Sequence, residues 1–225
     1  MSFIPSEGAP AERPQPPAKP GLPRLLPVGW LTAILISVSI AATLACGFGK
    51  NTPVLVRWVI SEFDGLGYGI FMPEIEEGQV WRLLTPIFIH FDAASFVFDL
   101  LGLAILGALV ERKEGKWSLL AQVIVFGAAS NFAQFVTSGP VFGGMSGVLY
   151  GLLGRLWIKS RLEPDAPATV SAPVAIVMVG WLGLCMTGRI PHAATYAQGV
   201  GLGLGALWGF VSVAVSRRAG KSPRV

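Results

Sequence analysis

The sequence predicts an all-α, polytopic membrane protein, built as a six-transmembrane-helix bundle with a long first loop. Hydrophobic residues make up 52% of the 225 residues and charged residues only 13%, whereas soluble domains carry roughly 25% charged residues. Six apolar segments divide the chain, and a helix that spans a bilayer takes about 20 residues. These segments are expected to be helices, because a backbone in lipid must satisfy its own hydrogen bonds.

The first 27 residues precede the bundle and are expected to form a disordered cytoplasmic tail. They are rich in proline and show no hydrophobic periodicity, so they lack the apolar surface that folding requires. They differ from a signal peptide, because the first apolar run begins late and is long enough to span a membrane. That run is therefore predicted to be a retained helix.

The bundle and its loops follow from the order of the apolar segments. Spans are predicted at 28–48, 93–110, 116–137, 144–160, 168–187 and 193–215. Residues 28–215 then form one membrane domain, and 216–225 form a basic cytoplasmic tail. Short connections make the second to sixth helices antiparallel neighbours. The long loop, 49–92, has only short apolar stretches interrupted by acidic residues, so it is expected to lie in or on the membrane interface.

The basic residues indicate the orientation of the bundle. With an even number of spans, 13 of the 17 lysines and arginines fall on the side of the N-terminal tail. Only Lys50, Arg57, Arg82 and Arg189 fall on the other side. The positive-inside rule then predicts that both termini are cytoplasmic and that the long loop faces outward.

Composition argues against several function classes. The net charge of +4 comes from basic residues beside apolar segments, not from a long basic run, so no nucleic-acid partner is expected. Cys46 and Cys185 lie in apolar runs and indicate core packing. The two histidines are far apart and have no cysteine or carboxylate neighbours at ligand spacing. No metal site and no cofactor are therefore expected.

Polar residues inside the spans mark the candidate site, because such groups are costly in a membrane and are usually functional. Ser146 lies in Gly144-Met145-Ser146-Gly147 at the start of the fourth span, where free backbone N–H groups are available to a developing oxyanion. A serine there also has a structural explanation, since serines cap helices and small residues line helix contacts in membranes. The other candidates are Asp99, Asn131, Gln134 and Gln198.

Three blocks of sequence together resemble the rhomboid family of intramembrane serine proteases, over about residues 28–215. Trp81-Arg82 resembles the family's Trp-Arg pair in the first loop. Gly144–Gly147 resembles its GxSG serine motif, with Tyr150 one helical turn on, and 199–209 resembles the glycine pattern of its last helix. The resemblance implies a site that opens into a water-filled cavity from the non-cytoplasmic side. It also implies that transmembrane helices of other proteins enter from the lipid bilayer, and that the chain lies in a bacterial inner membrane.

The resemblance fails at the catalytic residues. Family proteases use a Ser–His dyad, with the histidine in an AHxxGxxxG pattern, but the matching position here is Gln198, whose carboxamide has no useful basicity near neutral pH. The family's HxxxxHxxxN pattern matches His90, Ser95 and Asp99, so the second histidine and the asparagine are both replaced. The oxyanion region is expected at Ser95, Asp99 and Gly144. An ionised Asp99 there would repel an oxyanion, whereas a protonated Asp99 would donate to it.

Two main functions remain open from these residues, beside a purely structural or transport role. The first is a rhomboid pseudoprotease, which binds transmembrane helices without cleaving them. The second is an active serine endopeptidase in which Ser146 uses a non-standard base, with Asp99, His90 or a bound water as candidates. His192 is expected to lie on another face of the last helix and too far from Gln198.

Further residues are expected to support the site. Gly201 and Gly205 in the last helix have small-xxx-small spacing, as do Gly147 and Gly151 in the fourth, which permits a close contact that holds Ser146 beside Gln198.

The ends of the first loop and of the second span are expected to lie at the membrane surface. Trp81 and Arg82 are expected to anchor the long loop in the interface, and His90 is expected to be structural. Glu111, Arg112 and Lys113 are expected to form a solvated helix end.

Overall fold

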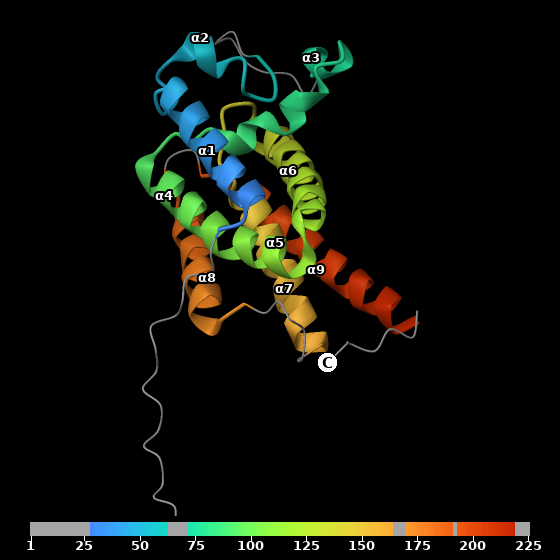
Figure 1. Cartoon of the computed structure of the whole chain (residues 1–225). Coiled ribbons are helices and arrows are strands. Elements are labelled where there is room, and N and C mark those ends of the chain that lie inside the picture. The colour runs from blue at the N-terminus through green and yellow to red at the C-terminus, as the bar shows by residue number, and fades with distance from the viewer. Residues whose placement is uncertain (1–27, 63–71, 164–169, 191–192, 219–225) are drawn as a thin grey trace, which may run out of the picture.

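The computed structural model describes residues 28–62, 72–163, 170–190 and 193–218, and every regular element in these ranges is helical. The predicted tail at 1–27 and the end of the chain after Arg218 lie outside the described residues. Figure 1 shows a bundle of long helices with the short helices α2 and α3 at one end.

One helix falls in each of the six predicted segments. The helices are α1 (Trp30–Ala45), α4 (Ala93–Gly102), α6 (Lys116–Ser138), α7 (Ser146–Leu162), α8 (Ala172–Met186) and α9 (Thr195–Arg218). A π-helical turn, η3 (Leu103–Gly107), joins α4 without a break to α5 (Ala108–Glu114). Helix α9 continues three residues past the boundary at 215 that the hydropathy pattern gives.

Three of these helices are long and apolar enough to cross a membrane, namely Ala93–Glu114, Lys116–Ser138 and Thr195–Arg218. Trp30–Ala45 and Ala172–Met186 are apolar but shorter. Helix α7 carries Arg155, Lys159 and Arg161 in its second half. The fold is thus an apolar helical bundle, and the count of six spans stays a prediction.

The described parts of the long first loop pack onto the bundle. They form α2 (Thr52–Leu55), α3 (Pro73–Glu76) and the 3-10 helices η1 (Val80–Leu83) and η2 (Thr85–Phe88). Ile60 and Ile87 are almost fully buried. The loop therefore adds a second layer to the core at this end of the molecule.

Arg82 holds this loop together. It is 4% exposed and its guanidinium donates to the carbonyl oxygens of Val56 and Val59 at 2.8 and 3.2 Å. It also pairs with Glu62 at 2.9 Å. The neighbouring Trp81 is 56% exposed, as an interfacial anchor would be.

Glu74 fastens the other side of the same loop. Its carboxylate accepts the Ser61 hydroxyl at 2.9 Å and the Glu62 backbone N–H at 2.7 Å. Burial by itself would raise the pKa of Glu74, but these hydrogen bonds and the charge of Arg82 lower it overall. The folded loop thus favours the ionised carboxylate.

Helix α7 is the centre of the bundle, because every residue from Ser146 to Leu156 is buried. It packs most closely on α9. A Cβ atom at Gly201 would overlap the carbonyl oxygen of Gly147, and one at Gly205 would overlap that of Gly151. Only glycine lets the two backbones approach this closely.

Glu111 corrects one expectation about the end of the second span. It is 8% exposed, and its carboxylate accepts the backbone N–H groups of Leu31 and Thr32 at 2.9 and 2.8 Å. The first N–H groups of a helix have no partner within the helix, and Gly29 at the N-cap of α1 offers no side chain. Glu111 therefore caps α1, and the expectation of a solvated side chain was wrong for this residue.

Candidate functional site

Ser146 is the first residue of α7, and the segment before it depends on glycine. Gly144 has a φ of +110°, a conformation that other residues rarely adopt, and its N–H donates to Pro86 O at 3.1 Å. A Cβ at Gly143 would lie 2.5 Å from the carbonyl oxygen of Ile89. Gly143 and Gly144 thus bring the start of α7 against the first loop, which fixes where Ser146 points.

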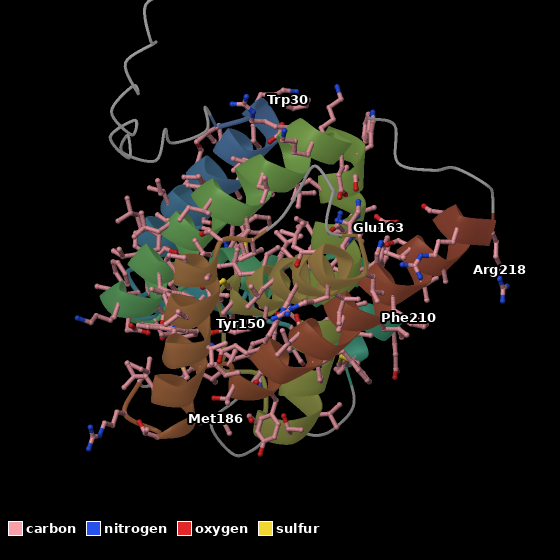
Figure 2. The ribbon with its side chains drawn as sticks, turned by 90° about the horizontal axis from the view of Figure 1, so that it is seen from below. Trp30, Tyr150, Glu163, Met186, Phe210 and Arg218 are labelled. Atoms are coloured by element: carbon pink, nitrogen blue, oxygen red, sulfur yellow. The ribbon has the colours of Figure 1, made fainter. Side chains whose placement is uncertain are left out.

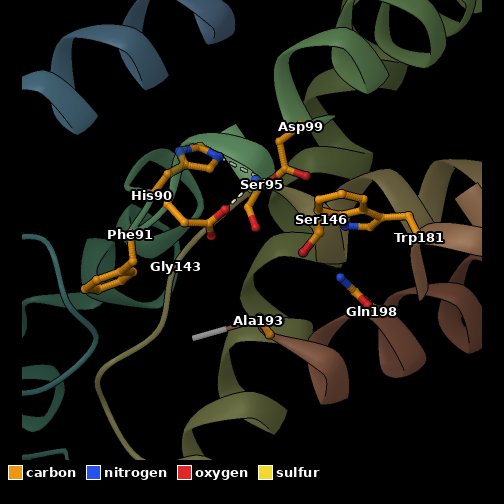
Figure 3. Close-up of a pocket in the computed structure, with 11 residues that line it drawn as sticks. His90, Phe91, Ser95, Asp99, Gly143, Ser146, Trp181, Ala193 and Gln198 are labelled. Carbon is orange, nitrogen blue, oxygen red and sulfur yellow. Dashed lines mark hydrogen bonds and ion pairs between the residues drawn. The ribbon is translucent and has the colours of Figure 1, made fainter. Parts of the chain in front are cut away.

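Ser146 lines a small polar pocket (Figure 3). The space open to the centre of a water molecule is about 10 Å³, enough for about one water. Ser146 is 6% exposed, and its hydroxyl makes no hydrogen bond with the described residues. The pocket is lined by His90, Phe91, Asp92, Ser95, Asp99, Gly143, Ser146, Trp181, Ala193, Ala194 and Gln198.

Asp99, from α4, is the most strongly held polar side chain of the pocket. It is 2% exposed, and its Oδ2 accepts the backbone N–H of Met145 at 2.6 Å. The same oxygen lies 3.2 Å from Nε2 of His90. Its other oxygen, Oδ1, is buried and has no hydrogen-bond donor among the described residues. The N–H that directly precedes Ser146 is therefore already bonded to a carboxylate.

His90 links Asp99 to the first helix. Its Nδ1 lies 3.0 Å from the hydroxyl of Thr43 in α1, and that hydroxyl also contacts the carbonyl oxygen of Phe88 at 3.2 Å. Both ring nitrogens thus have partners. His90 holds α1, the loop and α4 together, and it is 1% exposed.

Gln198 lies in the first turns of α9 and faces the same pocket. Its amide nitrogen donates to the sulfur of Cys185 in α8 at 3.6 Å. Its carbonyl oxygen is buried without a donor among the described residues. The glycine contact at Gly201 lies one helical turn away, so the α7–α9 packing brings Gln198 close to Ser146 (Figure 3).

Helix α8 contributes Trp181 to the pocket and is attached to the bundle by two contacts. The Trp181 ring stacks on Phe98 of α4, with ring centroids 4.4 Å apart and an interplanar angle of 9°. The buried hydroxyl of Tyr150 donates to the carbonyl oxygen of Met178. Met178 and Cys185 are the only buried residues of α8, so this helix is held more loosely than its neighbours.

The structure sorts the residues that the sequence singled out. Ser146, Gln198, Asp99, Ser95 and His90 meet at one pocket. A Cβ at Gly144 would lie 3.0 Å from Asp99 Oδ2, so Gly144 borders them.

Two other candidates connect helices instead. Asn131 donates to Leu83 O at 2.8 Å, and Gln134 accepts the N–H of Ala197 at 3.1 Å. Both fasten α6, one to the loop and the other to α9. Trp81 and Arg82 belong to the loop, and His192 lies outside the described residues.

Sequence reasoning missed Thr43, Trp181 and Cys185 as neighbours of the site. Each lies in an apolar helix, and nothing in its local pattern separates it from a packing residue. Each is recognised as a neighbour of the site only by the residue that it contacts in the folded chain. Among the residues that the structure describes, no group of three or more His, Cys, Asp or Glu side chains is arranged to hold a metal ion.

Comparison with known proteins agrees with the fold and the motifs. A family model described as a rhomboid domain matches residues 77–215, more than half of the chain. The chain is similar to a rhomboid protease GlpG homolog of Cronobacter sakazakii, 29% identical over 179 residues that cover 78% of this chain and 61% of that protein. It is also similar to rhomboid protease GlpG of Salmonella choleraesuis, 31% identical over 157 residues that cover 69% of this chain and 52% of that protein. The chain thus spans about half to three fifths of the length of these relatives. It belongs to the rhomboid family.

Proposed function

We propose that this chain is a rhomboid pseudoprotease, which binds transmembrane helices of other membrane proteins without cleaving them. In this proposal the chain crosses a bacterial inner membrane six times with both termini in the cytoplasm. Client helices reach the pocket of Ser146 from the lipid side. Helix α8, which is fastened mainly by Tyr150 and Trp181, is the element that would move to admit them.

The observation that carries the proposal is the position of the Asp99 carboxylate. Acyl transfer to a serine requires donors aimed at the developing oxyanion. Here the Met145 N–H, next to Ser146, is bonded to Asp99 at 2.6 Å. An ionised Asp99 brings negative charge to the place where negative charge must develop, and in a low-dielectric site that repulsion is large.

The second support is Gln198, at the family's histidine position. A general base must take the proton of the nucleophile at a pKa near the working pH. An amide cannot do so. Its nitrogen is engaged with Cys185, and the imidazole that lines the pocket, His90, has partners on both nitrogens.

One observation favours the alternative, an active endopeptidase with a non-standard base. Asp99 Oδ1 is buried with no donor among the residues described, and it shares the pocket with Ser146. In the alternative, Asp99 takes the proton of Ser146 directly or through one water.

A gel-based cleavage assay in liposomes separates the two. We expect no cleavage of a generic rhomboid substrate by the wild type, and weak or no cleavage by Gln198→His, because catalytic residues act as a unit. The triple variant Gln198→His, Asp99→Asn, Ser95→His is expected to cleave, since one oxyanion hydrogen bond contributes about 10²–10³ in rate. Adding Ser146→Ala to the triple variant must abolish that cleavage. Robust wild-type cleavage that Ser146→Ala removes overturns the pseudoprotease proposal.

Binding is tested in the same liposomes with a labelled single-span client helix. Fluorescence transfer to the chain, labelled in its N-terminal tail, is expected for the wild type and equally for Ser146→Ala. A serine-directed activity probe is expected to leave the wild type unlabelled. Labelling at Ser146 with no client binding would contradict both parts of the proposal.

The proposed orientation is tested with reporters. Reporters fused after Arg112 and after Arg161 are expected in the cytoplasm, and one inserted near Gly65 is expected outside. A cytoplasmic reporter at Gly65 would overturn the assigned orientation.

A further inference from the structure

A second, largely apolar groove lies away from the Ser146 pocket, between α6 and α9. Its volume is about 390 Å³, and it is lined by Val125, Phe126, Leu204, Leu207, Trp208, Val211 and Ser212. Its floor is the contact between Phe126 and Trp208, whose rings meet edge to face at 5.7 Å. The Ser212 hydroxyl is bonded to Gly209 O within α9. The groove therefore offers a ligand hydrocarbon contacts and no free polar group of its own.

The groove continues along α9 as a stripe that ends in a cation. Leu204, Leu207, Val211, Val215 and Arg218 follow one another at three- or four-residue steps, so they share one face of the helix. Leu207, Val211 and Val215 are 59%, 49% and 60% exposed. The apolar part from Leu204 to Val215 is about 16 Å long at 1.5 Å per residue. That length matches the hydrocarbon thickness of one leaflet, roughly 15 Å.

Arg218 lies less than one helical turn beyond Val215, where the apolar stripe ends. It is exposed, has no partner among the described residues, and Figure 2 shows it at the outer end of α9. Its neighbour Arg217 lies on another face of the helix and is engaged, since it donates to the carbonyl oxygen of Leu162 at 2.7 Å. Of the two described arginines at the end of α9, Arg218 is thus the one that is available and in line with the groove.

We propose that this groove is a binding site for an anionic phospholipid, with an acyl chain along Leu204–Val215 and the phosphate at Arg218. Charge complementarity at one end and an apolar stripe of leaflet length favour this occupant. Basic residues that flank a membrane groove on the cytoplasmic side are a general means of selecting anionic lipids.

Trp208 provides the test, because it lines the groove. The full chain is reconstituted in mixed phosphatidylcholine and phosphatidylglycerol bilayers in which one lipid has brominated chains. Quenching of Trp208 is isolated as the difference between the wild type and Trp208→Phe. At equal mole fraction, brominated phosphatidylglycerol is expected to occupy the site about fivefold more than brominated phosphatidylcholine, the factor that one arginine near the surface contributes.

Two matched variants decide the role of charge. Arg218→Gln is expected to reduce the preference to about one, whereas Arg217→Gln, which removes the same charge from another face, leaves it unchanged. Equal quenching by both lipids in the wild type overturns the proposal, and so does an equal loss in both variants. If neither lipid quenches Trp208, a protein segment or a second copy of the chain covers the groove, and the proposal is also overturned.

Discussion

Two neighbouring regions differ in how completely their atoms are partnered. One is the seam, the close contact of α7 with Gly201 and Gly205 of α9, and the other is the Ser146 pocket. Along the seam, Gly201 and Gly205 lie against the backbone of α7 with no space left over. In the pocket, oxygens of Asp99 and Gln198 are buried without donors from the part of the chain that the structure describes. The seam depends on shape alone. The pocket depends on the chemistry of its side chains.

The largest expected effect breaks the seam. Gly205→Ala places a methyl group on the carbonyl oxygen of Gly151, so α7 and α9 must separate, at a cost of about 3 kcal/mol for overpacking. Gly203→Ala is the matched control, because a Cβ there meets nothing within 4 Å. The free energy of unfolding of both variants is measured by titrating SDS into the protein in a mild detergent. Equal stability of the two variants would contradict the role given to the seam.

The second prediction breaks the pocket and leaves the seam intact. Asp99→Leu leaves the Met145 N–H buried without an acceptor, which costs about 2 kcal/mol. Asp99→Asn keeps an acceptor oxygen and is expected to cost less than about 1 kcal/mol. The same SDS titration compares the two. If both variants lose the same stability, the charge of Asp99 and not its hydrogen bond holds the start of α7.

The difference between these regions also decided what the sequence could predict. Hydropathy located the helices to within a few residues, and small-residue spacing predicted the contact between α7 and α9. Both signals repeat along a helix. The bond from Asp99 to Met145 and the contact of His90 with Thr43 join segments far apart in the chain, and no local pattern encodes them.

The prediction for the end of the second span failed for a related reason. Glu111 is a charged residue next to an apolar run, which predicts exposure, but it is buried because it accepts the first N–H groups of α1. Arg82 was expected to anchor the loop, but its partners, the carbonyl oxygens of Val56 and Val59, could not be predicted from the sequence. Unpaired backbone groups that reach a charged side chain from elsewhere in the chain are invisible in a one-dimensional pattern.

The third prediction compares the loop with the bundle through pH. The pKa of Glu74 is lowered in the folded loop, so its contribution is present above the unfolded pKa of about 4.3. It is lost as the pH falls through the folded value. Glu74→Gln should therefore cost about 1 kcal/mol at pH 7 and less at pH 3. Proteolysis of the loop at the two pH values, with an acid-active protease, measures this. A cost that is the same at both would show that the carboxylate charge does not contribute.

The smallest expected effect is at Ser146 itself, and it bears on why the serine is there. Its hydroxyl makes no hydrogen bond with the described residues, and the seam below it is formed by glycines. Ser146→Ala is therefore expected to change stability by less than about 0.5 kcal/mol, as measured by the same SDS titration used for Gly205→Ala. If the change in stability is that small, neither packing nor capping explains the serine, and its role lies in what the pocket binds. A loss of 1 kcal/mol or more would instead make Ser146 part of the scaffold, and the GxSG motif would then be no argument for chemistry in this chain.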